Sequence, residues 1–180
     1  MVVIKQKICL LGSFGVGKTS LMERFVNDRF DEKYLSTVGV SVSQKLMPPI
    51  PEKRGDKAVR FLFLIWDIAG LEKFDSTVIN YFRGASGALA VADVTRPDTI
   101  GNLRPIIEKF ASVNPQSALV TVGNKIDLLE EPRTTPVGLK QLAVRYSAET
   151  VLTSAKTGTG VEEAFVTLSK RIEAPDGKSV

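Results

Sequence analysis

The sequence contains no histidine, and this absence excludes several classes of enzyme. Without an imidazole there is no Ser-His-Asp triad, no zinc site that uses histidine and no histidine general base. Any catalysis by this chain therefore depends on carboxylates, lysine, hydroxyl groups, backbone groups or a metal ion.

Cysteine and long apolar runs are almost as scarce. Cys9 is the single cysteine, so an internal disulfide is excluded, and its place in the apolar run 8–11 predicts a small core residue. A reducing compartment is consistent with this usage. The chain has no run of about 18 apolar residues that predicts a membrane-spanning helix, and its N-terminus lacks the pattern of a signal peptide.

Signals for a lipid anchor and for nucleic-acid binding are also missing. Val2 stands where myristoylation needs glycine, and no cysteine lies near the C-terminus. The net charge is +4 and the pI about 9.2, but no basic cluster reaches the density of a nucleic-acid or membrane patch. We therefore expect a cytoplasmic monomer with no intrinsic membrane anchor and no nucleic-acid partner, folded as one domain over residues 1–180.

The sequence does contain a phosphate-binding loop. Residues 12–19, GSFGVGKT, match the pattern G-x-x-x-x-G-K-[ST] between an apolar run and a segment with helical spacing. Glycines let backbone N–H groups approach phosphate oxygens, and Lys18 adds a full charge. The Thr19 hydroxyl suits a Mg²⁺ ion. The pattern predicts nucleotide contacts from Ser13, Phe14, Gly15, Val16, Gly17, Lys18, Thr19 and Ser20.

Hydrophobic periodicity predicts an α/β fold. We expect strands over 2–11, 40–46, 59–66, 85–92, 118–122 and 150–153, and helices from the loop to about 26, over 98–111, 137–144 and 161–172. Asp98 is expected to cap its helix, which Pro105 bends or delays. Residues 29–39 are expected to form an exposed loop, 47–56 a proline-rich hairpin tip, and 71–82 a partly helical segment. This order predicts a mostly parallel six-stranded sheet with one antiparallel edge strand and helices on both faces.

An aspartate follows the third expected strand, where sites in such sheets gather. Asp67, with Gly70 three residues later, fits a carboxylate that holds Mg²⁺ and a glycine whose N–H meets a γ-phosphate. Alone, D-x-x-G is a weak pattern that also suits an ordinary turn. Its position after a phosphate loop favours the functional interpretation.

Two further strand ends carry residues suited to a nucleobase. In the NKID stretch at 124–127, the Asp127 carboxylate is able to accept hydrogen bonds from N1–H and the 2-amino group of guanine, donors that adenine lacks on that edge. The Lys125 stem is able to lie along a purine face. In the TSAK stretch at 153–156, the Ala155 N–H is placed to donate to the base carbonyl. We predict nucleotide contacts from Asn124, Lys125, Asp127, Ser154, Ala155 and Lys156.

In this order, the pieces resemble the small Ras-like GTPases, most closely the Rab type, across nearly the whole chain. The resemblance rests on GSFGVGKTS at 12–20, Thr37 within YLSTVGV, WDIAG at 66–70, NKID and TSAK. It implies a P-loop NTPase G domain and a switch that binds GTP or GDP with Mg²⁺ and signals through loops near 30–41 and 67–82 to protein effectors and regulators. Phe30 would pack on guanine, Tyr34 would cover the phosphates, and Thr37 would join Thr19 and Asp67 at the metal. The implied catalytic residues are Lys18, Thr37, Gly70 and the residue after Gly70.

Two departures from the family pattern bear on catalysis. Leu71 replaces the glutamine that orients the attacking water, and Phe14 occupies a loop position that is usually small. Together they predict hydrolysis below the roughly 10⁻⁴ s⁻¹ of unassisted Ras. Leu71 is either the natural residue or an engineered change. Its role is either to contact a protein partner or to remove catalysis. Glu72 could partly replace the missing amide. The alternative function is a GTP-locked binding module without significant turnover; an ATP-using enzyme is disfavoured by residues 124–127.

Overall fold

The computed structural model describes residues 2–32, 37–49, 59–69, 76–130 and 134–173. Its centre is a six-stranded sheet in the order β2-β3-β1-β4-β5-β6. All neighbouring pairs are parallel except β2 and β3, which confirms the predicted antiparallel strand at one edge. The strands are β1 (Val2–Leu11), β2 (Val40–Leu46), β3 (Val59–Ile68), β4 (Gly87–Asp93), β5 (Ala118–Asn124) and β6 (Glu149–Leu152).

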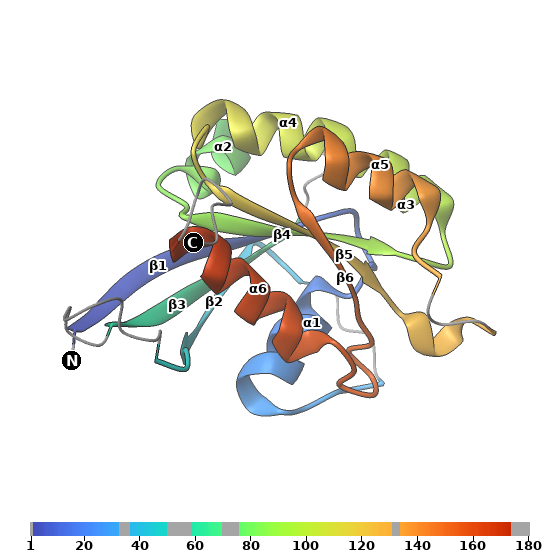
Figure 1. Cartoon of the computed structure of the whole chain (residues 1–180), viewed down its shortest axis with the longest axis horizontal. Helices are drawn as coiled ribbons and strands as arrows, with labels where there is room; N and C mark the ends of the chain where they lie inside the picture. The colour runs from blue at the N-terminus through green and yellow to red at the C-terminus, as the bar shows by residue number, and fades with distance from the viewer. Residues whose placement is uncertain (1, 33–36, 50–58, 70–75, 131–133, 174–180) are drawn as a thin grey trace, which may run out of the picture.

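Helices cover both faces of this sheet (Figure 1). On one face, α1 and α6 pack over a core that includes Phe25 and Phe165, whose rings are stacked with centroids 3.8 Å apart. On the other face, α2, α3, α4 and α5 enclose a second core around Phe82 and Phe110. The helices are α1 (Lys18–Asn27), α2 (Ser76–Phe82), α3 (Pro97–Gly101), α4 (Leu103–Val113), α5 (Val137–Arg145) and α6 (Val161–Glu173).

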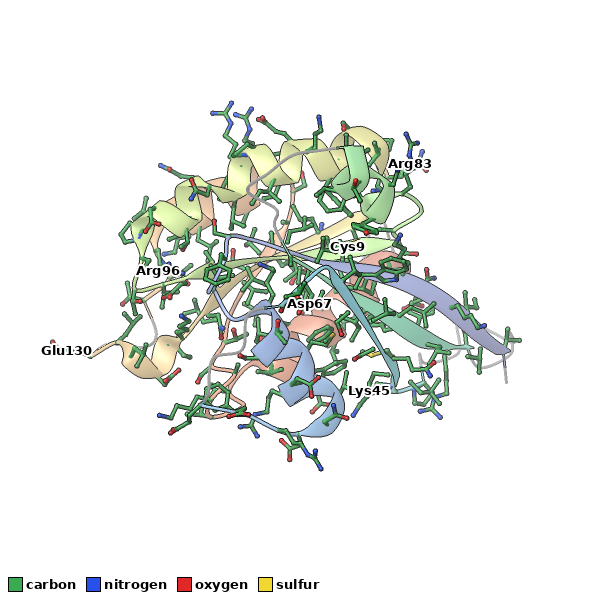
Figure 2. All side chains as sticks on the ribbon, turned by 180° about the vertical axis from the view of Figure 1, so that it is seen from behind. Cys9, Lys45, Asp67, Arg83, Arg96 and Glu130 are labelled. Carbon is green, nitrogen blue, oxygen red and sulfur yellow. The ribbon has the colours of Figure 1, made fainter. Side chains whose placement is uncertain are left out.

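Strand β4 lies in the middle of the sheet and is buried along its whole length. Its small side chains let helices approach closely. A Cβ added at Gly87 would lie 2.9 Å from the Leu168 side chain of α6. The neighbouring strand β1 carries Cys9, which is fully buried as its apolar surroundings predict (Figure 2). Burial raises the pKa of the Cys9 thiol to about 12.

The predicted helix over 98–111 proves to be two helices. Arg96, not Asp98, is the N-cap, and Pro97 takes the first helical position, where a missing N–H costs nothing. The break falls at Asn102, between α3 and α4. Pro105 explains the break because it has no N–H to donate to the carbonyl of Gly101. The predicted bend at Pro105 is therefore a complete interruption three residues earlier.

Other predicted boundaries shift by a few residues. β3 continues to Ile68, and β6 begins at Glu149. The tip at 50–58 and residues 70–75 lie outside the described chain, so the predicted proline-rich tip and the start of the 71–82 segment are not placed. Within the described ranges, no helix is long and apolar enough to cross a membrane.

Candidate functional site

A cavity of about 750 Å³ opens where the strands end at their carboxyl side. This is within the usual volume range for a small-molecule site, and its position is the one expected for an open α/β sheet. It brings together most residues that the sequence predicted to bind a nucleotide or a metal. The predicted residues that line it are Phe14, Gly15, Gly17, Lys18, Thr19, Ser20, Phe30, Thr37, Asp67, Asn124, Lys125, Asp127, Ala155 and Lys156.

A few predicted residues do not line the cavity. Ser13 and Ser154 are buried beside it, and the Val16 side chain is fully buried in the core under α1, so Val16 has only its backbone to offer a ligand. Tyr34, Gly70 and Leu71 lie outside the described residues. Their predicted roles stay predictions.

Lys18 sits at the floor of the phosphate loop. Its ammonium group donates to the carbonyls of Gly12 and Ser13, at 2.7 and 2.9 Å. The residue is only 9% exposed, so this charge is held close to the cavity and largely out of water. A cation fixed in this way at a helix N-terminus is a ready site for phosphate.

Two loop glycines have no possible replacement. Gly12 has φ +142° and a Cβ there would lie 2.2 Å from the Val91 carbonyl oxygen. Gly17, the N-cap of α1, has φ +98° and its Cβ would lie 2.3 Å from Asn124 Nδ2. The backbone is therefore packed against the ends of β4 and β5 with no space for a side chain.

The NKID stretch holds the phosphate loop from the other side. Asn124 Nδ2 donates to the Val16 carbonyl at 3.0 Å, and Lys125 Nζ donates to the Gly15 carbonyl at 2.8 Å. Lys125 has φ +70°, an uncommon conformation for a residue with a side chain. Strain of this kind persists where surrounding contacts over-determine it, and here two side-chain contacts of Lys125 do so.

Three oxygen-bearing side chains meet beneath the phosphate loop. Thr19 Oγ1 lies 2.7 Å from Thr37 Oγ1, and both hydroxyls hydrogen-bond Asp67 Oδ2. Asp67 is 1% exposed, and its Oδ1 has no hydrogen-bond partner in the described part of the chain. Figure 2 shows Asp67 near the start of α1. A buried carboxylate oxygen without a partner marks a place that a cation would satisfy.

The opposite end of the cavity is built from side chains of two loops. Ser154 Oγ donates to Asp127 Oδ1 at 2.6 Å and so orients this exposed carboxylate. The Ala155 N–H, predicted to meet a base carbonyl, donates to Asn124 Oδ1 at 3.2 Å, so a base would have to share this donor. Arg24 of α1 donates to the carbonyls of Ala155 and Lys156, at 2.8 and 2.6 Å.

Sequence reasoning missed the role of Asp93 at the end of β4. This carboxylate is 2% exposed, and one of its oxygens lies 2.7 Å from Lys125 Nζ and 3.2 Å from Arg96 Nε. Burial alone would raise the pKa of Asp93, but hydrogen bonds from Lys125 and Thr95 outweigh burial and lower it. The available signal was its position at the carboxyl end of a strand, the edge where the phosphate loop also lies. Arg96 and Arg24 also contact the site, but neither lies in a sequence motif that would have pointed to it.

The fold and the cavity define a class of protein. A buried lysine under a glycine-rich loop between β1 and α1 is the arrangement of a P-loop nucleotide-binding protein.

Comparison with known proteins narrows this class. The sequence model of the Ras family matches residues 7–174. Ras-related protein Rab-31 of Rattus norvegicus is 35% identical over 177 residues, which cover 98% of this chain and 87% of the relative. Ras-related protein Rab-22A of Homo sapiens is 34% identical, with coverage of 98% and 88%. GTP-binding protein ypt5 of Schizosaccharomyces pombe is 35% identical, with coverage of 98% and 82%. The chain belongs to the Ras family, as a Rab-like small GTPase.

Proposed function

We propose that this protein is a guanine-nucleotide switch that binds GTP and GDP with Mg²⁺ and hydrolyses GTP slowly. The observation that carries the proposal is the convergence of Lys18, Asp67 and Asp127 on one cavity from three separate segments of the chain. The first two serve phosphate and metal, and the third serves the base. Family membership supports the same interpretation, since one relative, ypt5, is named a GTP-binding protein.

The residues at the proposed metal position fit Mg²⁺. Among the described residues no three His, Cys, Asp or Glu side chains gather into a group that could hold a metal ion, so the proposed ligands are two hydroxyls and one carboxylate. The oxygens of Thr19, Thr37 and Asp67 suit a hard cation that takes few protein ligands and keeps its waters. Bound there with phosphates, Mg²⁺ would neutralise negative charge. The two hydroxyls and the carboxylate would hold it.

Selectivity for guanine would come from Asp127. In the open cavity this carboxylate is exposed, and Ser154 fixes its orientation. A guanine would supply two donors to it, whereas adenine would bury it without a donor. Sites that use a hydrogen-bonding group in this way reject the analogue that lacks the partner by orders of magnitude.

The rate of hydrolysis would be limited by two side chains. Leu71 has no hydrogen-bonding atom in its side chain with which to orient water. Phe14 lines the cavity with its side chain 55% exposed, which supports the proposed crowding of the γ-phosphate. The same observation favours the second candidate, a GTP-locked binding module whose loops present a constant surface to effectors.

Three measurements test this proposal. Mass spectrometry of the nucleotide released from the purified protein should find GDP or GTP, and competition titration should rank GTP above ATP by at least a hundredfold. Tighter binding of ATP would overturn the guanine assignment. Single-turnover hydrolysis then separates the candidates: a slow but measurable rate supports the switch, and no turnover supports the locked module.

A further inference from the structure

The phosphate loop has a regular feature beyond its motif. Every carbonyl from residue 12 to residue 17 accepts a hydrogen bond from another group of the protein, so each of these oxygens is held in place. The donors are, in order, Lys18 Nζ for residues 12 and 13, Arg96 Nη2 for residue 14, Lys125 Nζ for residue 15, Asn124 Nδ2 for residue 16 and the Leu21 N–H for residue 17.

Arg96 is the one side-chain donor in this set that belongs to no phosphate or base motif. It lies just after β4, at the N-cap of α3, and reaches across to the Phe14 carbonyl at 3.2 Å. Figure 2 shows it at the end of the molecule opposite Arg83. A Cβ on Gly15 would lie 3.6 Å from the same guanidinium nitrogen, so the group lies against the outside of the loop.

The guanidinium is itself held in place. Asp93 Oδ2 accepts from Arg96 Nε at 3.2 Å and from Lys125 Nζ at 2.7 Å. One buried carboxylate oxygen therefore holds both cations that pin the consecutive carbonyls of Phe14 and Gly15. The other oxygen of Asp93 accepts from the backbone and hydroxyl of Thr95.

We propose that Arg96 is a positioning residue for the phosphates, acting through the peptide between Phe14 and Gly15. In a trans peptide the C=O and the N–H point in opposite directions. Holding the Phe14 oxygen outward therefore aims the Gly15 N–H into the cavity. This inference rests on the proposed function, because it assigns a task to Arg96 only if phosphates occupy that cavity.

The shape of arginine suits this task. Its planar group donates from Nε to Asp93 and from Nη2 to the Phe14 carbonyl, and the two contacts together fix its plane. A lysine ammonium is a point donor without this planar geometry. Residue 14 carries a bulky phenylalanine ring. The hydrogen bond from Arg96 limits the orientations open to the peptide that follows this ring.

The test compares Arg96→Ala, Arg96→Lys and wild type in the full chain, with Arg104→Ala as the control because Arg104 lies on α4 outside the cavity lining and pairs with exposed Glu108. Affinities for GDP, GTP and inosine diphosphate are measured by competition against a fluorescent GDP analogue. Arg96→Ala should weaken GDP and GTP about tenfold, the effect of one charge-assisted hydrogen bond, and Arg96→Lys less. Guanidinium chloride at low millimolar concentration should restore part of the loss, whereas tetramethylammonium chloride should not.

The ratio of GDP to inosine diphosphate affinity separates positioning from general damage. These ligands differ only at the base, so a defect confined to the phosphate loop leaves the ratio unchanged. Unchanged GDP affinity in Arg96→Ala, or a loss that guanidinium does not restore and that also changes this ratio, would overturn the inference. Absence of guanine-nucleotide binding by wild type would instead overturn the proposed function, and the inference with it.

Discussion

The two ends of the cavity are built in different ways. The phosphate end is made of backbone whose carbonyls are fixed by buried or paired cations, chiefly Lys18 and Lys125. The opposite end is made of side chains: exposed Asp127, oriented by Ser154, and the 155–156 loop held by Arg24. Positive charge and N–H groups at the first end suit any phosphate, whereas one carboxylate at the second end selects the base. We therefore expect substitutions at the phosphate end to lower affinity for every nucleotide, and substitutions at the base end to change which base is preferred.

The largest expected effect comes from breaking the phosphate end at Lys18. Lys18→Ala removes a buried ammonium bound to the carbonyls of Gly12 and Ser13, so GTP affinity should fall roughly a hundredfold or more. Isothermal titration with GTP checks this. Lys140→Ala, on the exposed face of α5, should bind like wild type. A Lys18→Ala protein that keeps tight GTP binding would contradict the assignment of this lysine.

A substitution at Asp127, at the base end, should change which nucleotide the protein prefers. Asp127→Asn replaces an acceptor-only group with an amide, so GTP affinity should fall by more than about 1.4 kcal/mol, or tenfold. Xanthosine triphosphate, whose base presents a carbonyl where guanine has an amino group, should become competitive. The exposed Asp98→Asn change serves as control. Unchanged affinity for both nucleotides would remove Asp127 from the site.

A third change tests the role in hydrolysis that is proposed for Leu71. Leu71→Gln supplies the missing amide, so the single-turnover rate of GTP hydrolysis should rise by at least about tenfold if catalysis is latent. Leu71→Ala removes the bulk without adding an amide and should leave the rate near that of wild type. Equal rates in all three proteins would favour the GTP-locked module.

The smallest expected effect concerns an ion pair at the base end. Lys156 Nζ lies 3.3 Å from Glu32 Oε1, and both side chains are mostly exposed. Such pairs contribute about 0.2–1 kcal/mol, so Glu32→Gln should speed GDP release by about 1.4- to fivefold. The difference should disappear near 1 M salt, where charges are screened. Glu149→Gln, which breaks a pair with Arg171 far from the cavity, is the control. A change that persists at high salt would point to another cause.

The sequence predicted the mostly parallel sheet with its antiparallel edge strand, and most of the residues that line the cavity, because these depend on local patterns. The phosphate loop needs particular residues at particular spacings, and the buried strands appear as apolar runs. It did not predict the break at Asn102. Pro105 leaves the Gly101 carbonyl without its helical donor, and that matters only if the helix begins early enough to include Gly101, as it does here. The tasks of Asp93, Arg96 and Arg24 depend on contacts between distant segments, and an ordinary charged residue gives no sign of them.

Helix α1 has a consequence for the size of the ligand. It begins at Lys18 beneath one end of the cavity and, six residues later, its Arg24 grips the loop at the other end. At 1.5 Å per residue these two anchors stand about 9 Å apart along the axis. The length of this helical segment therefore fixes the distance between the phosphate end and the base end of the cavity. One residue inserted between them would swing Arg24 about 100° around the axis and detach the loop it carries.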